Sequence, residues 1–237
     1  MTEKGSLKVT LAIYTLNEID GMRAVMPRIR REWCDEIIVI DGGSTDGTVE
    51  FARELGLPVY RQSEPRWGGA HREAYARARG DVVIDFSPDG NSLPELIPGL
   101  ISKIKEGYDM VIASRYTADA KSEDDTPVTA FGNHLFTGMV NLIFGGHFTD
   151  SLVIFRAFRM DFLNRAGITN RTLPQCVTVL TCIRAARMKA KTTDIPGDEP
   201  RRIGGKPKMN PLIDGLRILR VMFNELFSKI PEMARTV

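Results

Sequence analysis

Short apolar runs alternate with stretches of helical spacing along the first half of the chain. The runs have the length and composition of buried strands. They lie at residues 9–13, 36–40, 58–61, 81–86 and 110–113. The stretches with helical spacing lie between them, at 20–32, 48–55 and 69–79. Because strands that alternate with helices are joined by right-handed crossovers, this pattern predicts an α/β fold with a mostly parallel sheet covered by helices on both faces.

The second half of the chain predicts further elements of both kinds. They are a helix over 128–144, a strand near 153–158, a helix in the later half of 168–188 and an amphipathic helix over 212–230. The polar segment 117–126 predicts an exposed, mobile loop, and the proline-rich segment 196–211 predicts a flexible basic loop. We therefore expect one α/β domain over residues 1–195, followed by a basic loop and an amphipathic helix over 196–237.

Composition narrows the class of protein. The 237 residues are 43% hydrophobic and 26% charged, with a net charge of +2, which is ordinary for a soluble globular protein and predicts no nucleic-acid partner. Cys34, Cys176 and Cys182 lack the close pairing of zinc sites and indicate a reducing compartment. The first residues do not resemble a secretion signal, and no apolar stretch approaches the roughly 20 residues of a bilayer span. We expect a cytoplasmic protein.

Polar side chains follow the apolar runs at the points where ligands bind to parallel sheets. Asn17 and Glu18 follow the first run, Asp41 the second, and Asp89 with Asn91 the fourth. Carboxylates in such places suit a divalent cation and a nucleotide, because Mg²⁺ and Mn²⁺ prefer oxygen ligands and retain phosphate oxygens.

Each of these motifs also has a purely structural interpretation. The segment 87–91 consists of common turn formers, and Asp46 suits a role in capping the helix that follows it. Asp41, at the strand end, can reach a ribose hydroxyl or a base N–H. The three histidines lack ligand spacing, which disfavours a histidine metal site. No GxGxxG follows the first run, which disfavours a dinucleotide-binding dehydrogenase.

Five sequence blocks in a fixed order carry a family resemblance. They are Ile13–Glu18 ending in Asn-Glu, Glu36–Thr48 containing Asp-Gly-Gly-Ser-Thr-Asp-Gly, Ala78–Val83, Val111–Tyr116, and Thr149–Asp150 with Phe155–Arg159. Over about residues 8 to 160 the chain resembles the family 2 glycosyltransferases of the GT-A fold. The branch it resembles contains dolichyl-phosphate mannose synthase and bacterial polyprenyl-phosphate glycosyltransferases.

The resemblance implies roles for particular residues. A sugar-nucleotide donor would contact Thr15, Asn17, Glu18, Asp41, Ser44, Asp89, Asn91 and Arg202. Asp89, with Asn91, would hold Mg²⁺ or Mn²⁺ against the diphosphate and so assist the leaving group. Arg115 and Arg156 would supply positive charge near phosphate or acceptor, and Asp150 would act as general base or orient the acceptor. Members of this family invert the anomeric centre by direct displacement.

The chain departs from the family pattern at several positions. Tyr14 stands where proline is usual, and Ser87 replaces the first aspartate of the metal motif, so that Asp85 is a further candidate ligand with different spacing. Ile154 stands where glycine is common. The arginine often found before the helix at 128–144 is missing, and Asn133 and His134 lie nearby instead.

The C-terminal segment bears on the acceptor. Its helix has a broad apolar face formed by Leu216, Leu219, Phe223, Leu226, Phe227 and Ile230. The basic residues that precede it are Arg201, Arg202, Lys206 and Lys208. This helix could lie in a membrane interface beside an anionic polyprenyl phosphate, or pack on the domain or on a second copy in a homodimer.

Three functions remain open on the sequence. The leading one is transfer of a hexose from a UDP- or GDP-sugar to a polyprenyl phosphate, with the protein peripheral at the cytoplasmic membrane face. The second keeps the donor but uses a soluble saccharide or other hydroxyl acceptor, which requires Asp150 as a base. The third is a non-catalytic module that binds nucleotide-sugars.

Overall fold

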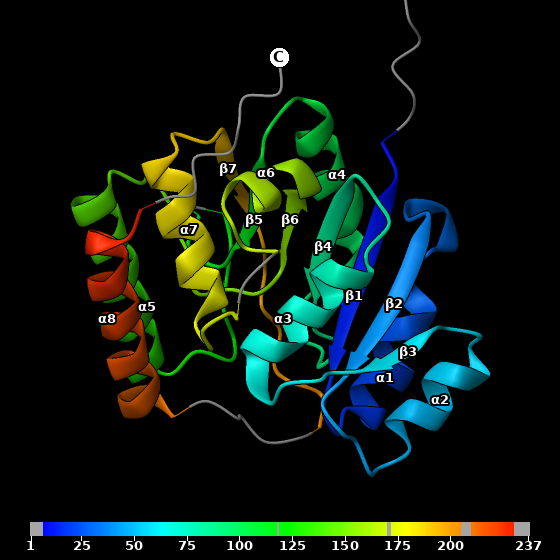
Figure 1. The fold of residues 1–237 in the computed structure, drawn as a ribbon. Helices are drawn as coiled ribbons and strands as arrows, with labels where there is room; N and C mark the ends of the chain where they lie inside the picture. The colour runs from blue at the N-terminus through cyan, green and yellow to red at the C-terminus, as the bar shows by residue number, and fades with distance from the viewer. Residues whose placement is uncertain (1–6, 118, 170–171, 205–209, 230–237) are drawn as a thin grey trace, which may run out of the picture.

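A central sheet organises the molecule (Figure 1). The computed structural model describes residues 7–117, 119–169, 172–204 and 210–229. Within them the sheet has seven strands: β1 (Val9–Thr15), β2 (Glu36–Asp41), β3 (Val59–Arg61), β4 (Val82–Phe86), β5 (Met110–Ser114), β6 (Arg156–Arg159) and β7 (Thr192–Pro196). Their order across the sheet is β3-β2-β1-β4-β6-β5-β7. Strand β6 runs antiparallel to β4 and β5, while the other neighbouring pairs are parallel. The predicted mostly parallel α/β sheet is therefore confirmed.

Alternate residues of each central strand face two separate apolar cores. In β1, Leu11 and Ile13 join one core, while Ala12 and Tyr14 join the other. This alternation explains the continuous apolar runs in the sequence, since both faces of the sheet are covered. The first core is closed by α1 (Ile19–Val25), α2 (Thr48–Glu54) and α4 (Ile97–Lys105). The second is closed by α3 (Arg66–Arg77), α5 (Pro127–Phe144), α6 (Met160–Arg165), α7 (Val177–Arg187) and α8 (Pro211–Phe227).

Several predicted elements differ in extent from those observed. The helix expected over 20–32 ends at Val25, and two short 3₁₀ turns follow it, because Pro27 cannot donate the backbone hydrogen bond that would continue the helix. The segment predicted as a mobile loop, residues 117–126, is hydrogen-bonded to the connection that follows β7. Ser122 Oγ donates to Glu199 at 2.5 Å, and Lys121 N donates to Asp198 at 2.8 Å.

Helix α8 packs against α5 and α7 at one end of the molecule (Figure 1). The side turned inward carries Gly215, Ile218, Val221, Met222 and Glu225. Buried ion pairs hold it there, since Glu225 pairs with Arg184 at 2.9 Å and with Arg187 at 3.3 Å. The apolar face predicted from the sequence points outward. Of the residues predicted there and before the helix, Ile230, Lys206 and Lys208 lie outside the described residues.

No helix within the described ranges combines the length and the apolar character needed to span a bilayer.

Candidate active site at the carboxyl edge of the sheet

The ends of β1 and β2 form an interlocked pair of loops around Asp41. Strand pairing places Thr15 directly beside Asp41, and Thr15 Oγ1 donates to the Asp41 carboxylate at 3.0 Å. The same carboxylate accepts from Gly43 N at 2.7 Å, from Ser44 N at 2.9 Å and from Ser44 Oγ at 2.5 Å. Asp41 thus shapes the loop after β2, while its contact with a base or ribose stays a prediction.

Asn17 and Glu18 tie the first loop to the second. Asn17 adopts a left-handed conformation, with φ of 55°, which asparagine tolerates better than most residues. Its backbone N–H donates to Ser44 Oγ at 2.8 Å, and its side-chain oxygen accepts from Thr45 N at 2.8 Å. Glu18 N donates to Thr48 Oγ1 at 3.0 Å. The predicted donor residues Thr15, Asn17, Glu18, Asp41 and Ser44 are therefore neighbours.

A second cluster forms around the turn that follows β4. Asp89 is 6% exposed, and one of its carboxylate oxygens lies 2.9 Å from Arg202 Nη1. The same arginine nitrogen lies 3.9 Å from Glu18 Oε1. The other Asp89 oxygen accepts from Asn91 N at 3.1 Å. Four predicted residues, Glu18, Asp89, Asn91 and Arg202, are therefore brought together from three separate segments at one edge of the sheet.

Close packing fixes the Asp89 turn from both sides. On one side α1 approaches so closely that a Cβ on Gly21 would lie 2.2 Å from the Pro88 carbonyl oxygen. On the other side Ile203 N donates to the Asp89 carbonyl oxygen at 2.7 Å. Gly90, with φ of 91°, makes room for the Ile203 side chain, which would lie 2.7 Å from an added Cβ. The direction of the Asp89 carboxylate is therefore set by the backbone.

The donor set at this turn fits a divalent cation that also binds substrate. Within the described residues, no group of three or more His, Cys, Asp or Glu side chains is arranged to hold a metal. Asn91 Oδ1 is nevertheless buried and has no hydrogen-bond partner in the described parts of the chain. An orphaned buried oxygen beside a carboxylate is a suitable cation ligand. Asp89 and Asn91 can thus supply two oxygens, and a diphosphate and water the rest.

The third cluster is a buried ion pair between Arg115 and Asp150. Arg115 Nε and Nη2 donate to the two Asp150 oxygens at 2.6 and 3.0 Å, and the Asp150 side chain is 0% exposed. Leu152 N and Val153 N each donate to Asp150 at 3.0 Å. Burial alone would raise the pKa of Asp150, but the Arg115 charge and these hydrogen bonds outweigh it and lower the pKa below its usual value. Asp150 is therefore a weak base in this arrangement.

Arg156 makes its hydrogen bonds inside the second core and not in any of the three clusters, whereas a contact with phosphate or acceptor was expected. It is 0% exposed, and its guanidinium donates to backbone carbonyls of Val153 and Thr178. Thr181 Oγ1 accepts a further hydrogen bond at 3.2 Å. Its strand, β6, is covered on both sides, and the arginine satisfies backbone groups inside the second core. In this structure Arg156 therefore has a structural role, and its contact with phosphate or acceptor stays a prediction.

Asp85 also has a role that the sequence did not reveal. It is 1% exposed and accepts hydrogen bonds from Tyr14 at 2.7 Å and from Tyr75 at 2.8 Å. His71 Nε2 lies 3.4 Å from the same carboxylate, and its ring stacks on Tyr14 with centroids 4.6 Å apart. These contacts commit Asp85 to the core and leave it unsuited to the cation. Tyr14, which replaces the usual proline, is thus a partner of Asp85.

Glu199 is a site residue that sequence reasoning missed. Its carboxylate lies 3.4 Å from Arg115 Nη1, and it follows β7, an edge strand whose Thr-Thr-Asp-Ile-Pro sequence lacks a clear apolar run. Recognition of β7 would have placed Glu199 at the carboxyl edge of the sheet, together with Arg202.

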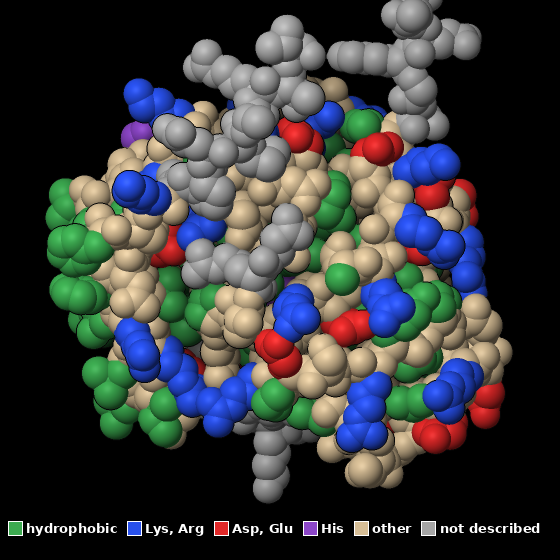
Figure 2. Space-filling view, in the orientation of Figure 1, with side chains coloured by type: hydrophobic (Ala, Val, Ile, Leu, Met, Phe, Trp, Pro, Cys, Tyr) green, Lys and Arg blue, Asp and Glu red, His purple; other side chains and the backbone are tan. Residues whose placement is uncertain are grey.

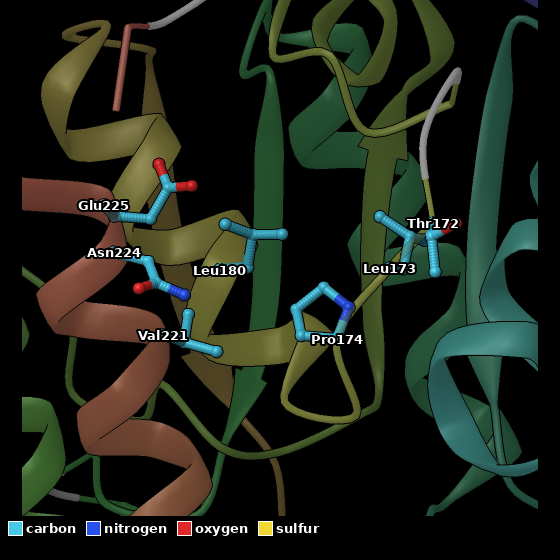
Figure 3. Close-up of a pocket in the computed structure, with 7 residues that line it drawn as sticks. All are labelled: Thr172, Leu173, Pro174, Leu180, Val221, Asn224 and Glu225. Atoms are coloured by element: carbon cyan, nitrogen blue, oxygen red, sulfur yellow. The ribbon is translucent and has the colours of Figure 1, made fainter. Parts of the chain in front are cut away.

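A pocket of about 230 Å³ lies elsewhere, between α7, α8 and residues 172–174 (Figure 3). Its lining residues are Thr172, Leu173, Pro174, Leu180, Val221, Asn224 and Glu225. None of the predicted site residues lines it, and its volume is below the roughly 300 Å³ typical of ligand pockets. We therefore place the candidate active site at the sheet edge.

Comparison with known proteins agrees with this geometry. The chain matches glycosyl transferase family 2 over residues 10–167. It is 31% identical over 218 residues to Glycosyltransferase AglJ of Haloferax volcanii, which covers 91% of this chain and 69% of the relative. It is 27% identical over 220 residues to the dolichyl-phosphate hexose transferase of the same organism, covering 92% and 93% of the two chains.

A solved structure supports the fold. Glucosyl-3-phosphoglycerate synthase from Mycobacterium tuberculosis, in complex with Mn²⁺, uridine diphosphate and phosphoglyceric acid, superimposes with a TM-score of 0.72 at 20% identity. The match covers 97% of this chain and 81% of that one. The strand order and the flanking helices define the GT-A fold. The chain belongs to glycosyl transferase family 2.

Proposed function

We propose that the protein is an inverting glycosyltransferase that moves a hexose from a UDP- or GDP-sugar to a polyprenyl phosphate. The observation that carries the choice of acceptor is the set of exposed apolar residues on the neighbouring helices α5 and α8. Its most exposed residues are Val128, Phe131, Leu142, Leu212, Leu216, Phe223 and Phe227. We call this set the α5–α8 surface. It forms much of the left edge in Figure 2, where hydrophobic side chains gather.

The α5–α8 surface has the composition of a membrane-facing patch. Leu142 is 87% exposed and Phe227 75%, and α5 has no charged residue in its 18 positions. Exposed apolar patches of such extent on soluble proteins mark interaction sites. A polyprenyl chain stays in the bilayer, so an enzyme that uses it benefits from a surface that lies on the membrane. We therefore propose a peripheral location at the cytoplasmic membrane face, with residues 1–195 as the catalytic domain, followed by the basic loop and amphipathic helix of residues 196–237.

On the donor side, Asp89 and Asn91 would hold Mg²⁺ or Mn²⁺, and Arg202 would contact the diphosphate. The bound cation would neutralise charge on the departing nucleotide. Glu18 and the loop shaped by Asp41 would orient the base and ribose. Holding the donor in one orientation favours direct displacement, because the acceptor then attacks from the opposite side of the anomeric carbon.

The Arg115–Asp150 pair favours a phosphate acceptor over a hydroxyl. A hydroxyl must lose its proton during attack, whereas a phosphate oxygen is already anionic at neutral pH. The lowered pKa of Asp150, caused by the Arg115 charge and hydrogen bonds against the opposing effect of burial, makes it a poor proton acceptor. Arg115, the cation of this pair, can attract an acceptor phosphate.

The decisive experiment offers both acceptor classes to the purified protein. Radiolabelled UDP-glucose or GDP-mannose, with Mn²⁺, would be incubated with undecaprenyl or dolichyl phosphate in detergent, and separately with soluble saccharides. We expect label in the lipid extract only with a polyprenyl phosphate. Label in a soluble product and none in the lipid would refute the proposed acceptor, and absence of transfer or donor hydrolysis with any sugar nucleotide would refute the enzyme assignment.

Vesicle flotation tests the α5–α8 surface independently. Leu142→Glu and Phe227→Glu should reduce binding to vesicles that contain anionic lipid, without loss of fold, because both side chains are exposed. The matched control is Leu55→Glu, which places the same charge at the end of α2. Equal flotation of all three variants would contradict membrane contact through this surface. A concentration-dependent dimer that the two surface variants abolish would instead assign the surface to a second copy.

A further inference from the structure

The connection after β7 joins the cation cluster to the Arg115–Asp150 pair. It starts at Gly197, whose N–H donates to the Ser114 carbonyl oxygen at 2.9 Å. Two residues on, Glu199 lies 3.4 Å from Arg115 Nη1. Three residues further, Arg202 Nη1 lies 2.9 Å from Asp89 Oδ2. This short segment therefore places the Glu199 carboxylate against Arg115, on the acceptor side. It also places the Arg202 guanidinium against Asp89, the proposed metal ligand.

We propose that Arg202 and a divalent cation exclude each other at Asp89, so that segment 197–204 is an ion-pair latch which cation and donor open together. This inference rests on the proposed function, since it assumes that Asp89 is the cation ligand. The guanidinium now supplies the positive charge that this carboxylate requires. A metal coordinated by the same oxygen, which is 2.9 Å from Arg202 Nη1, would lie within about 5 Å of that guanidinium, where two like charges repel.

The surroundings of Arg202 provide for both positions of its side chain. Glu18 Oε1, 3.9 Å from Nη1, adds negative charge at the turn and so favours whichever cation is present. Arg202 Nε is buried and has no hydrogen-bond partner within the described ranges. A donor diphosphate would bring a new anion to this donor group, and arginine binds phosphate oxygens through paired hydrogen bonds. The free energy lost when the Arg202–Asp89 ion pair breaks would thereby be offset by the contact of Arg202 with the diphosphate.

The latch also connects donor binding to the acceptor side. Asn91 Nδ2 donates to Asp124 Oδ2 at 2.8 Å, and Ser122, in the same segment as Asp124, donates to Glu199 at 2.5 Å. Movement of segment 197–204 together with Arg202 would break the backbone hydrogen bonds from Ile203 N to Asp89 and from Glu199 N to Lys121, and would take Glu199 away from Arg115. Arg115 would then have fewer carboxylates around it and a stronger attraction for an acceptor phosphate.

Binding of Mn²⁺ alone tests the exclusion without any need for catalysis. Free Mn²⁺ would be measured by electron paramagnetic resonance with wild type, Arg202→Gln, Arg201→Gln and Asp89→Asn, after circular dichroism shows that each variant is folded. Arg201→Gln is the matched control, because it removes the same charge from an exposed neighbour. We expect Arg202→Gln to bind Mn²⁺ roughly threefold to tenfold more tightly than Arg201→Gln, since a competing ion pair is removed. Asp89→Asn should bind it least.

Nucleotide binding should change in the opposite direction. With Mn²⁺ saturating, Arg202→Gln should bind UDP or GDP about tenfold more weakly than Arg201→Gln, because it lacks charge-assisted hydrogen bonds to the diphosphate. Equal Mn²⁺ affinity of Arg202→Gln and Arg201→Gln would overturn the latch while leaving the proposed function intact. Mn²⁺ binding that survives in Asp89→Asn, or no Mn²⁺ binding by any form even with nucleotide, would overturn the latch together with the proposed metal site.

Discussion

Replacement of Asp150 by asparagine separates the two acceptor classes. Asparagine has the same shape and keeps an oxygen for Leu152 N and Val153 N, but it removes the charge opposite Arg115. If Asp150 is a general base, its loss should lower kcat by about 10²- to 10⁴-fold. If the acceptor is a phosphate, no proton has to be removed, and we expect kcat at saturating acceptor to fall by less than about tenfold.

The same substitution should destabilise the fold by a predictable amount. Removal of one partner from a buried ion pair costs about 3–5 kcal/mol. Arg115 retains Glu199 at 3.4 Å and Asp125 at 3.9 Å, so we expect a loss at the lower end, about 3 kcal/mol. Urea denaturation would measure it, with Asp161→Asn as the control, because that carboxylate is 66% exposed and surface changes stay within about 0.5 kcal/mol.

The unfolding free energy that Asp150→Asn loses should depend on pH, because the pKa of Asp150 is lowered in the folded protein. Burial opposes the shift, but the Arg115 charge and the hydrogen bonds set its direction. The stabilisation is fully present above the unfolded value of about 3.9 and is lost as the pH falls through the lower folded pKa. The difference between wild type and Asp150→Asn should therefore be full at neutral pH and shrink under acid conditions. A hundredfold loss of kcat with no change in unfolding free energy would refute the reasoning.

Two substitutions and one measurement of thiol reactivity test other parts of the structure. Glu225→Gln should cost about 3 kcal/mol in urea denaturation, because two arginines lose their buried partner, whereas the exposed Glu50→Gln should change little. Gly90→Ala should lower the melting temperature and weaken Mn²⁺ binding, since φ of 91° is strained for alanine and the Cβ position is occupied. Burial raises the pKa of Cys176 and of Cys182 to about 11, so both thiols should react slowly with a disulfide reagent at about pH 8 and rapidly after denaturation.

The central strands were predictable because the sheet is covered on both faces. In β1, β2 and β4 nearly every residue is buried, and the sequence therefore has continuous apolar runs. Strand β7 was not predicted, since an edge strand with half-buried positions has no such run. Helix α4 was missed as well, although its apolar residues Ile97, Leu100, Ile101 and Ile104 have helical spacing.

The proximity of several candidate site residues was predictable, because these residues directly follow the ends of neighbouring strands. Glu18, Asp89 and Asn91 follow strand ends, and the structure brings the first two to Arg202. Arg156 was not predictable in the same way, because a charged residue in a motif does not reveal which way its side chain points. Its apolar neighbours Phe155 and Ala157 were the available sign of burial.

The orientation of α8 explains how an apolar surface stays exposed next to an apolar core. This helix has apolar residues on two sides, so burial of Ile218, Val221 and Met222 alone would not exclude a rotated packing that hides Phe223 and Phe227. Glu225 distinguishes the two apolar sides of the helix, because it lies on the side with Ile218, Val221 and Met222. Its pairing with Arg184 is satisfied in one rotation of the helix, and any other rotation would leave Arg184, which is 1% exposed, as an unpaired buried charge at a cost of several kcal/mol. We infer that the buried ion pair selects the face of α8 that is turned outward and so keeps the α8 residues of the α5–α8 surface exposed.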